Sequence, residues 1–432
     1  MPLRVLISAY SCKPEEGSEP SVGWNWARQA GRFHEVWVIT RTNNRAPIEK
    51  SLAKEPLPNV HWVYFDLPRW ARFWKRGQTG VHIYYYLWQI GVYFVARRMH
   101  SRIKFQLAHH VTLGGLWFPC FLSLLPVPFV WGPVGAGRPV ARTFWKEFSL
   151  RGRVNELLRV ATWLLTRLDP VRALTEDKAC AILAVSPATA KDVKPRNQHK
   201  ITLFSQVGFD SGDFEGPNGS NSRGSRPFTL LSVGRLVHWK GFSLAIRAFA
   251  TFHETFPNSQ QLIVGDGPEK TKLIELVTSL RLSECVHFIS TLSRQDYLAH
   301  MRCTDVLLYP GLHEPGAFVI VEAMATGKPV VCLDLGEPAL QVTNDTGIKV
   351  PAMFPEQVVQ DLAKAFHRLA SEPELCVQLG FGARKRMQEH FDWDKKGLFI
   401  TNLYQNLFTP EKNTADRNVP LAHEGSANSA GG

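Results

Sequence analysis

Short apolar segments alternate with helical patterns along most of this 432-residue chain, and the alternation occurs in two separate series. The strand-like runs of the first series are residues 5–9, 36–40, 60–65, 106–110, 127–131 and 181–185, and a helical pattern at 21–32 separates the first two. Strands that are separated by helices predict a parallel sheet with both faces covered. The first half is therefore predicted to be an α/β domain.

The second series begins after a polar, glycine-rich segment at residues 210–227, which is typical of a linker or surface loop. Strand-like runs at 229–233, 261–264, 286–289, 306–309 and 329–333 alternate there with helical patterns at 243–256, 269–280, 295–301 and 319–326. This series predicts a second parallel-sheet domain. Open α/β sheets bind ligands at the carboxyl ends of their strands, so we expect a cleft between the two domains.

These patterns divide the chain into an N-terminal domain at residues 1–209, a linker or loop at 210–227 and a C-terminal domain at 228–390. Helical patterns continue at 359–370 and 377–390, and an amphipathic helix is expected at 395–407 within a final segment, 391–408. The tail, 409–432, is polar and rich in small residues, so we expect it to be disordered.

Composition favours a folded cytoplasmic protein. The chain is 44% hydrophobic and 20% charged, as globular proteins are. Its seven cysteines are scattered, odd in number and without a C-x-x-C spacing, which argues against both a disulfide framework and a zinc site. The apolar run at residues 2–9 is too short for the hydrophobic region of a signal peptide and is better interpreted as a buried strand.

Positive charge is concentrated in the first half. The net charge is +12, and the 80 residues 67–146 contain eleven Lys or Arg and no Asp or Glu. Such a field favours a nucleic acid, an anionic membrane or a phosphorylated substrate, although solvated basic residues are the plainer alternative. No RNA-binding signature accompanies the charge, so a nucleic-acid partner is not expected.

Aromatic and basic residues stand side by side in residues 69–76, which begin with Arg69 and end with Arg76. This pairing suits the interface of an anionic membrane, so the segment is a candidate for peripheral docking. The uncharged run 77–96 contains His82 and Gln89 and is a poor transmembrane span. Residues 84–94 are better interpreted as an amphipathic core helix.

Two cations follow the first strand of the second series. Gly234 lets the backbone approach a ligand closely, while Arg235 supplies a forked donor and Lys240 a point charge. A strand, a glycine, two cations and then a helix suit a diphosphate. A turn with two solvated cations explains the loop equally well.

Two glutamates stand eight residues apart after the strand at 306–309. Glu314 lies in the loop, and Gly316 and Ala317 would present backbone N–H groups at the start of a helix, where an anion is favoured. Glu322 lies inside that apolar helix, where a carboxylate needs a hydrogen-bonding partner such as a sugar or ribose hydroxyl. The alternative is that Glu322 faces solvent or caps a neighbouring helix.

Four motifs occur in order across residues 230–350: Gly-Arg-Leu…Lys-Gly, Ile-Val-Gly-Asp-Gly-Pro at 263–268, Glu-x7-Glu, and Glu-Ala-Met-Ala-x-Gly-x-Pro-Val-Val at 322–331. Together they resemble family 4 (group 1) of the retaining glycosyltransferases. The resemblance implies a GT-B fold, in which two Rossmann-like domains face each other across a cleft and the last helix crosses back to the first domain. It also implies a nucleotide-sugar donor, retention of configuration and no cofactor or metal.

The resemblance implies a role for each matching residue. Arg235 and Lys240 would hold the donor diphosphate, Glu314 the transferred sugar and Glu322 the ribose. The remaining donor contacts would come from Gly234, Gly265, Gly316, Ala317 and Phe318. Two positions depart from the pattern: Gly316-Ala317 replaces the usual Phe-Gly, and Leu340 stands where a glutamate is common.

The N-terminal domain contributes weaker candidates. Gly17 lies in the loop after the first strand, where related enzymes carry a glycine facing the donor phosphates, although a plain surface turn is as well supported. His109 and His110 end a predicted strand where the family often has a histidine near the anomeric carbon. Alternation along a strand would place one of them on the cleft side, and which one stays open. A structural histidine is the alternative for each.

The sequence thus predicts a retaining glycosyltransferase that is cytoplasmic, or peripheral on the inner face of the plasma membrane. It would transfer a sugar from a nucleotide-sugar to a carbohydrate or lipid-linked acceptor. A GT-B epimerase or phosphorylase, or a protein that binds nucleotide-sugars without catalysis, remains the alternative. The nucleotide base, the sugar, the acceptor, the linkage and the oligomeric state are left open.

Overall fold

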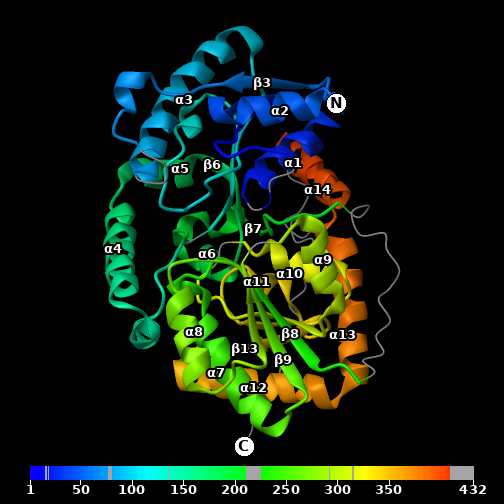
Figure 1. The fold of residues 1–432 in the computed structure, drawn as a ribbon. Coiled ribbons are helices and arrows are strands. Elements are labelled where there is room, and N and C mark those ends of the chain that lie inside the picture. The colour runs from blue at the N-terminus through cyan, green and yellow to red at the C-terminus, as the bar shows by residue number, and fades with distance from the viewer. Residues whose placement is uncertain are drawn as a thin grey trace, which may run out of the picture.

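The computed structural model describes residues 1–14, 17, 19–75, 80–135, 137–210, 225–290, 292–313 and 316–408. Its strands form two sheets, one from each half of the sequence. Figure 1 shows the sheet of the first half, with its helices, above that of the second. The predicted fold class, two Rossmann-like α/β domains, is confirmed. The tail at 409–432 and most of the segment at 210–227 lie outside the described residues.

The N-terminal sheet has seven strands in the order β3-β2-β1-β4-β5-β6-β7, and all its pairings are parallel. Six strands fall on the predicted runs. The seventh, β7, was missed because it has three residues, which is too short to show alternation. The strands are β1 (Arg4–Ser8), β2 (Glu35–Thr40), β3 (Val60–Tyr64), β4 (Leu107–His110), β5 (Phe129–Val134), β6 (Ala179–Ala184) and β7 (Ile201–Leu203).

Helices cover both faces of this sheet, because its central strands are apolar on both sides. Successive side chains of a strand point to opposite faces, and in β1 Ile7 packs against Trp26 while Leu6 packs in a cluster with Trp88. The helices are α1 (Glu19–Gly31), α2 (Arg45–Leu52), α3 (Val81–Ile103), α4 (Leu150–Arg167), α5 (Pro170–Lys178) and α6 (Pro187–Asp192). Short helices are η1 (Thr42–Asn44), η2 (Arg69–Ala71), η3 (Phe121–Leu124), η4 (Arg142–Glu147) and η5 (Pro195–Lys200).

The C-terminal sheet has six parallel strands in the order β10-β9-β8-β11-β12-β13. Five match the predicted runs, and β13, which follows a turn, was missed. The strands are β8 (Phe228–Val233), β9 (Ser259–Val264), β10 (Val286–Ile289), β11 (Val306–Tyr309), β12 (Val330–Leu333) and β13 (Gly347–Val350).

The helices of the C-terminal domain bury one apolar side each. In α12 the buried residues Val358, Leu362 and Phe366 recur every four positions, and Phe366 meets Phe252 of α7 edge to face at 5.9 Å. The helices are η7 (His238–Lys240), α7 (Phe242–Thr255), α8 (Lys270–Ser279), α9 (Arg294–Cys303), α10 (Phe318–Ala325), α11 (Pro338–Gln341), α12 (Pro355–Ser371) and α13 (Pro373–Arg386).

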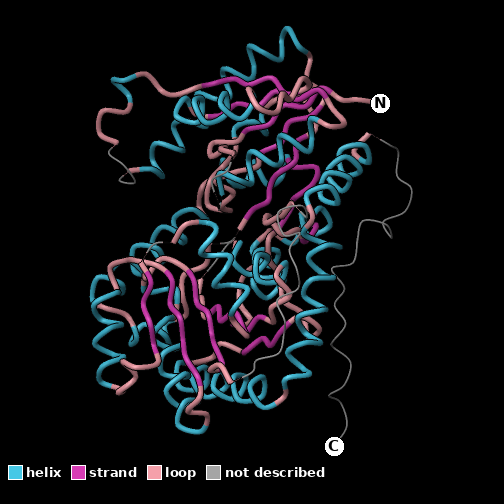
Figure 2. The backbone as a smooth tube through the Cα atoms, turned by 45° about the vertical axis from the view of Figure 1, so that its right-hand side comes forward, coloured by secondary structure: helices cyan, strands magenta, loops and turns pink. Residues whose placement is uncertain are grey.

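The last helix returns to the N-terminal domain. A π-helix, η8 (Met387–Phe391), leads into α14 (Trp393–Asn406), whose start is capped by the Asp392 carboxylate. Trp26 Nε1 of α1 donates a hydrogen bond to Tyr404 Oη at 3.2 Å. Both backbone views show α14 beside the N-terminal sheet (Figures 1 and 2). By its contacts, α14 therefore belongs to the N-terminal domain.

The segment with aromatic and basic residues divides into a buried and an exposed part. Tyr84, Tyr85 and Trp88 of α3 are fully buried, which confirms the core helix expected at 84–94. In contrast, Trp70 and Phe73 are each 78% exposed. None of the helices in the described ranges combines the length and the apolar character that crossing a bilayer requires.

Candidate active site at the interdomain cleft

Two adjoining cavities lie where the carboxyl ends of the two sheets face each other. The larger has a volume of about 510 Å³ and the smaller about 240 Å³, and Gly135 and Gly137 line both. The larger is bounded by the loops after β4 and β5, by α4, and by Gly316 and Phe318 of the C-terminal domain. The smaller is bounded by the loops after β5, β6, β11 and β12. This is the edge at which parallel sheets bind ligands.

Lys240 is held in place by the neighbouring strand. Its Nζ donates a hydrogen bond to Tyr309 Oη at 3.0 Å and lies 5.1 Å from the centre of that ring. A Cβ at Gly234 would lie 3.6 Å from the Lys240 Cε, so the lysine stem passes over the glycine. Arg235 is exposed on the same loop. Both cations thus lie on the C-terminal edge of the cleft, although neither lines the two cavities.

Gly265 allows two loops of this edge to pack together. Its φ is +147°, and a Cβ there would lie 2.0 Å from the backbone oxygen of Gly234. A side chain at this position would therefore both clash and strain the backbone. The loops after β8 and β9 consequently meet backbone to backbone.

Glu322 is bound by protein groups. Its carboxylate accepts hydrogen bonds from Tyr297 Oη and Arg294 Nη1, each at 2.5 Å, and its side chain is 14% exposed. Burial, together with this carboxylate, raises the pKa of Tyr297 well above its usual value. A sugar or ribose hydroxyl was the expected hydrogen-bonding partner of Glu322, and the structure shows two donors from α9. A bound ribose would share the carboxylate with them.

The loop before α10 approaches the segment that joins the domains. A Cβ at Gly316 would lie 2.3 Å from Gln206 Nε2, so only a glycine fits there without a shift. Gly316 and Phe318 line the larger cavity together with Gln206, whereas Ala317 is buried. Glu314, the predicted sugar contact, lies outside the described residues.

A buried glutamate and a buried lysine meet beneath this loop. Glu337 Oε1 accepts hydrogen bonds from Ser205 Oγ at 2.5 Å and from the Gln206 N–H at 3.0 Å. Lys396 of α14 donates to the Ser205 carbonyl at 2.7 Å. Burial raises the pKa of Glu337 to about 8 and lowers the pKa of Lys396 to about 7. Glu337 of the C-terminal domain and Lys396 of α14 therefore both bind the segment around Ser205, which connects the two domains.

The two predicted histidines lie inside the N-terminal domain, on opposite faces of the sheet. His109 Nδ1 lies 2.6 Å from Tyr404 Oη and its Nε2 lies 2.6 Å from the Gly132 carbonyl oxygen. His110 Nε2 lies 3.1 Å from Tyr85 Oη. The expectation that one histidine faces the cleft is wrong, because β4 is a central strand covered on both faces. Burial lowers the pKa of His109 to about 3 and that of His110 to about 4.

The loop after β1 reaches the cavity through a residue next to the predicted one. Gly17 lies in an exposed turn, and a Cβ built there meets nothing within 4 Å. Glu19, the first residue of α1, lines the larger cavity and accepts a hydrogen bond from the Leu113 N–H at 2.5 Å. Burial raises the pKa of Glu19. Glu19 therefore ties the loops after β1 and β4 together at the cavity wall.

Two further cavity residues come from helices that flank the cleft. His82, from α3, and Arg159, from α4, both line the larger cavity. Arg159 lies 5.1 Å from the centre of the Trp239 ring, and its Nε is 3.4 Å from Glu156 Oε1. Burial lowers the pKa of His82. Sequence reasoning missed both residues, because α4 was not predicted and a lone histidine at the start of α3 carries no motif.

The smaller cavity also holds residues that sequence reasoning missed. Arg138 lines it and binds the carboxylate of Asp192 through two hydrogen bonds of 2.7 Å. His313, one residue before Glu314, is a second lining residue, and burial lowers its pKa to about 3. An imidazole that stays neutral at pH 7 can both donate and accept a hydrogen bond.

The second half of the chain is similar to a known protein family. Residues 218–386 match the model of the family described as glycosyl transferases group 1. The glycogen synthase of Mycobacterium tuberculosis (strain ATCC 25618 / H37Rv) is 30% identical over 179 residues, which cover 41% of this chain and 42% of that protein. The chain thus matches less than half the length of such curated relatives.

Solved structures extend the likeness to both domains. The sucrose-phosphate synthase of Thermosynechococcus elongatus superposes with a TM-score of 0.64 at 19% identity, over 94% of this chain and 99% of that one. Anabaena Alr3699/HepE, solved in complex with UDP and glucose, superposes with a TM-score of 0.60 at 19% identity, over 94% of this chain and all of that one. The second half of this chain therefore matches the family model of the glycosyl transferases group 1, and the whole has the GT-B fold.

Proposed function

We propose that this protein is a retaining glycosyltransferase, which moves a sugar from a nucleotide-sugar to a carbohydrate or lipid-linked acceptor. The observation that carries the proposal is the position of Lys240, which Tyr309 holds at the edge of the interdomain cleft that contains the 510 Å³ cavity. This edge belongs to the part of the chain that matches the group 1 family model. That Anabaena Alr3699/HepE was solved with UDP and glucose supports a nucleotide-sugar donor.

The donor diphosphate binds at the loop after β8 in this proposal. Arg235 is exposed and offers a fork of N–H donors, and Lys240 is oriented by its hydrogen bond to Tyr309. Glu322 binds the ribose hydroxyls, and Glu314 binds the sugar. Preorganised cations stabilise the charge that develops on the departing diphosphate, and this stabilisation lowers the barrier.

The acceptor occupies the larger cavity. Trp117 and Phe118 offer flat apolar surfaces there, and Glu19, His82 and Arg159 offer polar groups. The acceptor hydroxyl attacks from the face that the diphosphate leaves, so no carboxylate nucleophile is required. The chemistry also requires no metal or cofactor. Sugar transfer is therefore expected to persist when a chelator such as EDTA is added, and its loss would contradict this part of the proposal.

We further propose that the protein works in the cytoplasm, at the inner face of the membrane. The scattered, odd-numbered cysteines support a reducing compartment. The exposed Trp70 and Phe73, which stand among Arg69, Arg72 and Lys75, support peripheral contact with an anionic surface.

A panel of UDP-, GDP- and ADP-sugars tests the function. Release of nucleoside diphosphate from one of them, together with transfer to a sugar acceptor, is expected. Arg235→Ala and Lys240→Ala should each lower turnover about 100-fold, because each removes a group that binds the departing charge. Arg281→Ala, an exposed cation elsewhere in the same domain, is the matched control.

Other outcomes point to the alternatives. Interconversion of two nucleotide-sugars without transfer indicates an epimerase, and release of sugar 1-phosphate from a glycan indicates a phosphorylase. Tight donor binding without any turnover indicates a non-catalytic nucleotide-sugar binding protein. Unchanged turnover in both Ala variants contradicts the proposed site.

A further inference from the structure

Helix α4 carries a continuous apolar surface that nothing in the described part of the chain covers. Leu157 is 54% exposed, Leu164 52% and Leu165 68%. With 3.6 residues per turn, these and the other members of the surface fall within a stripe about 120° wide. The stripe, called the α4 surface below, consists of Leu150, Val154, Leu157, Leu158, Ala161, Leu164, Leu165 and Leu168.

The opposite side of α4 contacts both domains. The apolar stripe therefore faces away from the protein. The Glu156 carboxylate is fully buried and accepts a hydrogen bond from the Val140 N–H at 3.0 Å. It also lies 3.2 Å from His238 Nε2 of the C-terminal domain. A Cβ at Gly152 would lie 3.0 Å from the His238 ring, so the helix lies close against that domain. An amphipathic helix usually packs its apolar side against the protein. Here the contacts of Glu156 and Gly152 leave the apolar side of α4 facing solvent.

The two charged residues that flank the α4 surface near the start of the helix are positive. Arg151 and Arg153 are exposed and flank the stripe on its two sides. Glu156 is the one acidic residue of the helix and points the other way. An apolar stripe between cations complements the interface of a bilayer that contains anionic lipid.

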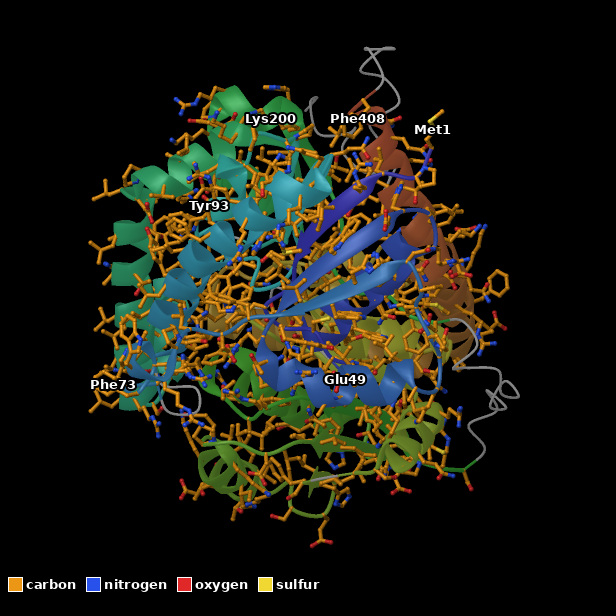
Figure 3. The ribbon with its side chains drawn as sticks, turned by 90° about the horizontal axis from the view of Figure 1, so that it is seen from above. Met1, Glu49, Phe73, Tyr93, Lys200 and Phe408 are labelled. Carbon is orange, nitrogen blue, oxygen red and sulfur yellow. The ribbon has the colours of Figure 1, made fainter. Side chains whose placement is uncertain are left out.

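The exposed aromatic segment lies on the same side of the molecule. The start of α3 and the middle of α4 border one cavity, through His82 and Leu158. Trp74 packs at the start of α3, since a Cβ at Gly80 would lie 2.7 Å from its ring. Phe73 and α4 both lie along the left edge of the molecule (Figures 1 and 3). The exposed Phe73 therefore lies on the same side of the molecule as the α4 surface.

We infer that α4 lies in the interface of an anionic membrane, with its apolar stripe among the lipid headgroups and acyl chains. The larger cavity opens beside that stripe, because Leu158 and Thr162 line it and Leu158 is 63% exposed. Docking thus brings the cavity mouth to the lipid surface. If the protein is the proposed transferase, this orientation also narrows the class of acceptor. The acceptor is then carried by a lipid in the same bilayer.

Vesicle sedimentation tests the docking. The full chain should sediment with vesicles of phosphatidylcholine and phosphatidylglycerol, and less with phosphatidylcholine alone or at high salt. The triple variant Leu157→Ser, Leu164→Ser, Leu165→Ser should lower the partition coefficient by about tenfold or more, because three exposed apolar side chains that would enter the bilayer interface are lost. Its matched control is Ile274→Ser, Phe381→Ser, Leu398→Ser, three exposed apolar residues elsewhere, which should bind like the wild type.

Two results would overturn the inference. One is equal vesicle binding by both triple variants. The other is a lipid-free dimer of the wild type, seen by sedimentation velocity, that the α4 variant alone converts to monomer while vesicle binding is unchanged. Vesicle binding needs no donor, and donor hydrolysis needs no vesicles. Failure of the docking is therefore distinguishable from failure of the transferase proposal.

Discussion

Glu337 and Lys396 bind the same residue from two sides: the carboxylate accepts from the Ser205 hydroxyl, and the ammonium group donates to the Ser205 carbonyl. Both side chains are buried, and Ser205 begins the segment by which the chain leaves the N-terminal domain. Burial opposes both charges, which raises the pKa of the glutamate and lowers that of the lysine. We therefore expect the stability of the interdomain connection to depend on pH.

Removing the Glu337 charge is expected to change how stability depends on pH. Because its folded pKa of about 8 exceeds the usual value of 4.5, the folded state binds the extra proton between these values. Stability conferred by this carboxyl is present below pH 4.5 and falls as pH rises toward 8, by at most about 1.4 kcal/mol per pH unit. Glu337→Gln should flatten the curve between pH 5 and 8. Urea melts across this window measure it, with Glu372→Gln, an exposed carboxyl, as the control.

Lys396 is expected to make the free energy of unfolding rise with pH at higher pH, the opposite of the effect of Glu337. The folded pKa of Lys396, about 7, lies below the usual 10.5, so the unfolded state binds the extra proton between these values. Stability should therefore rise with pH from 8 to 10, and Lys396→Met should abolish the rise. Urea melts at pH 8, 9 and 10 measure it. An unchanged slope in Lys396→Met would mean that another group is responsible.

Tyr404→Phe should loosen the crossing helix. The change removes the hydroxyl that lies between Trp26 Nε1 and His109 Nδ1, and leaves two buried polar atoms without that partner. The expected loss in the free energy of unfolding is about 1–3 kcal/mol. Tyr93→Phe, whose partly exposed ring lies on α3, should stay within about 0.5 kcal/mol of the wild type. Equal losses in both variants would contradict the role of this hydroxyl.

Gly316 and Gly17 make a matched pair. A methyl group at Gly316 would lie 2.3 Å from Gln206 Nε2, whereas at Gly17 it would meet nothing within 4 Å. Gly316→Ala should displace Gln206 at the cavity wall and raise KM for the donor, with a fall in Tm. Gly17→Ala should leave Tm unchanged. Thermal melts and donor saturation curves of the two variants measure the difference, and equal behaviour would contradict the close approach.

The sequence predicted the strands and loops of the C-terminal domain well, because their signals are local. The runs before Gly234 and Gly265 are short and largely apolar toward their carboxyl ends, and turn residues follow them. It failed where the outcome depends on distant partners. The protein donors to Glu322, Arg294 and Tyr297, come from another helix and were not predicted. Either His109 or His110 was expected at the cleft, but the partner of His109 is Tyr404 of α14, almost 300 residues later in the chain.

The orientation of helix α4 also could not be predicted from the sequence pattern. Its apolar stripe is present in the sequence, yet periodicity alone does not reveal that Glu156 and Gly152 face the protein and the leucines face solvent. The Glu337–Lys396 pair likewise has no motif, because three separate segments create it. Local patterns therefore predict which elements form, while tertiary contacts decide what their side chains face.

Direct titration of nucleoside diphosphates tests the central claim, that the edge carrying Arg235 and Lys240 binds the donor diphosphate. Calorimetry of the wild type with UDP, GDP and ADP should show micromolar binding of one of them. The double variant Arg235→Ala, Lys240→Ala should weaken that binding at least about 100-fold, since two charge-assisted contacts are lost. Binding that is equal in the wild type and the double variant, or no binding of any of the three, would contradict the account.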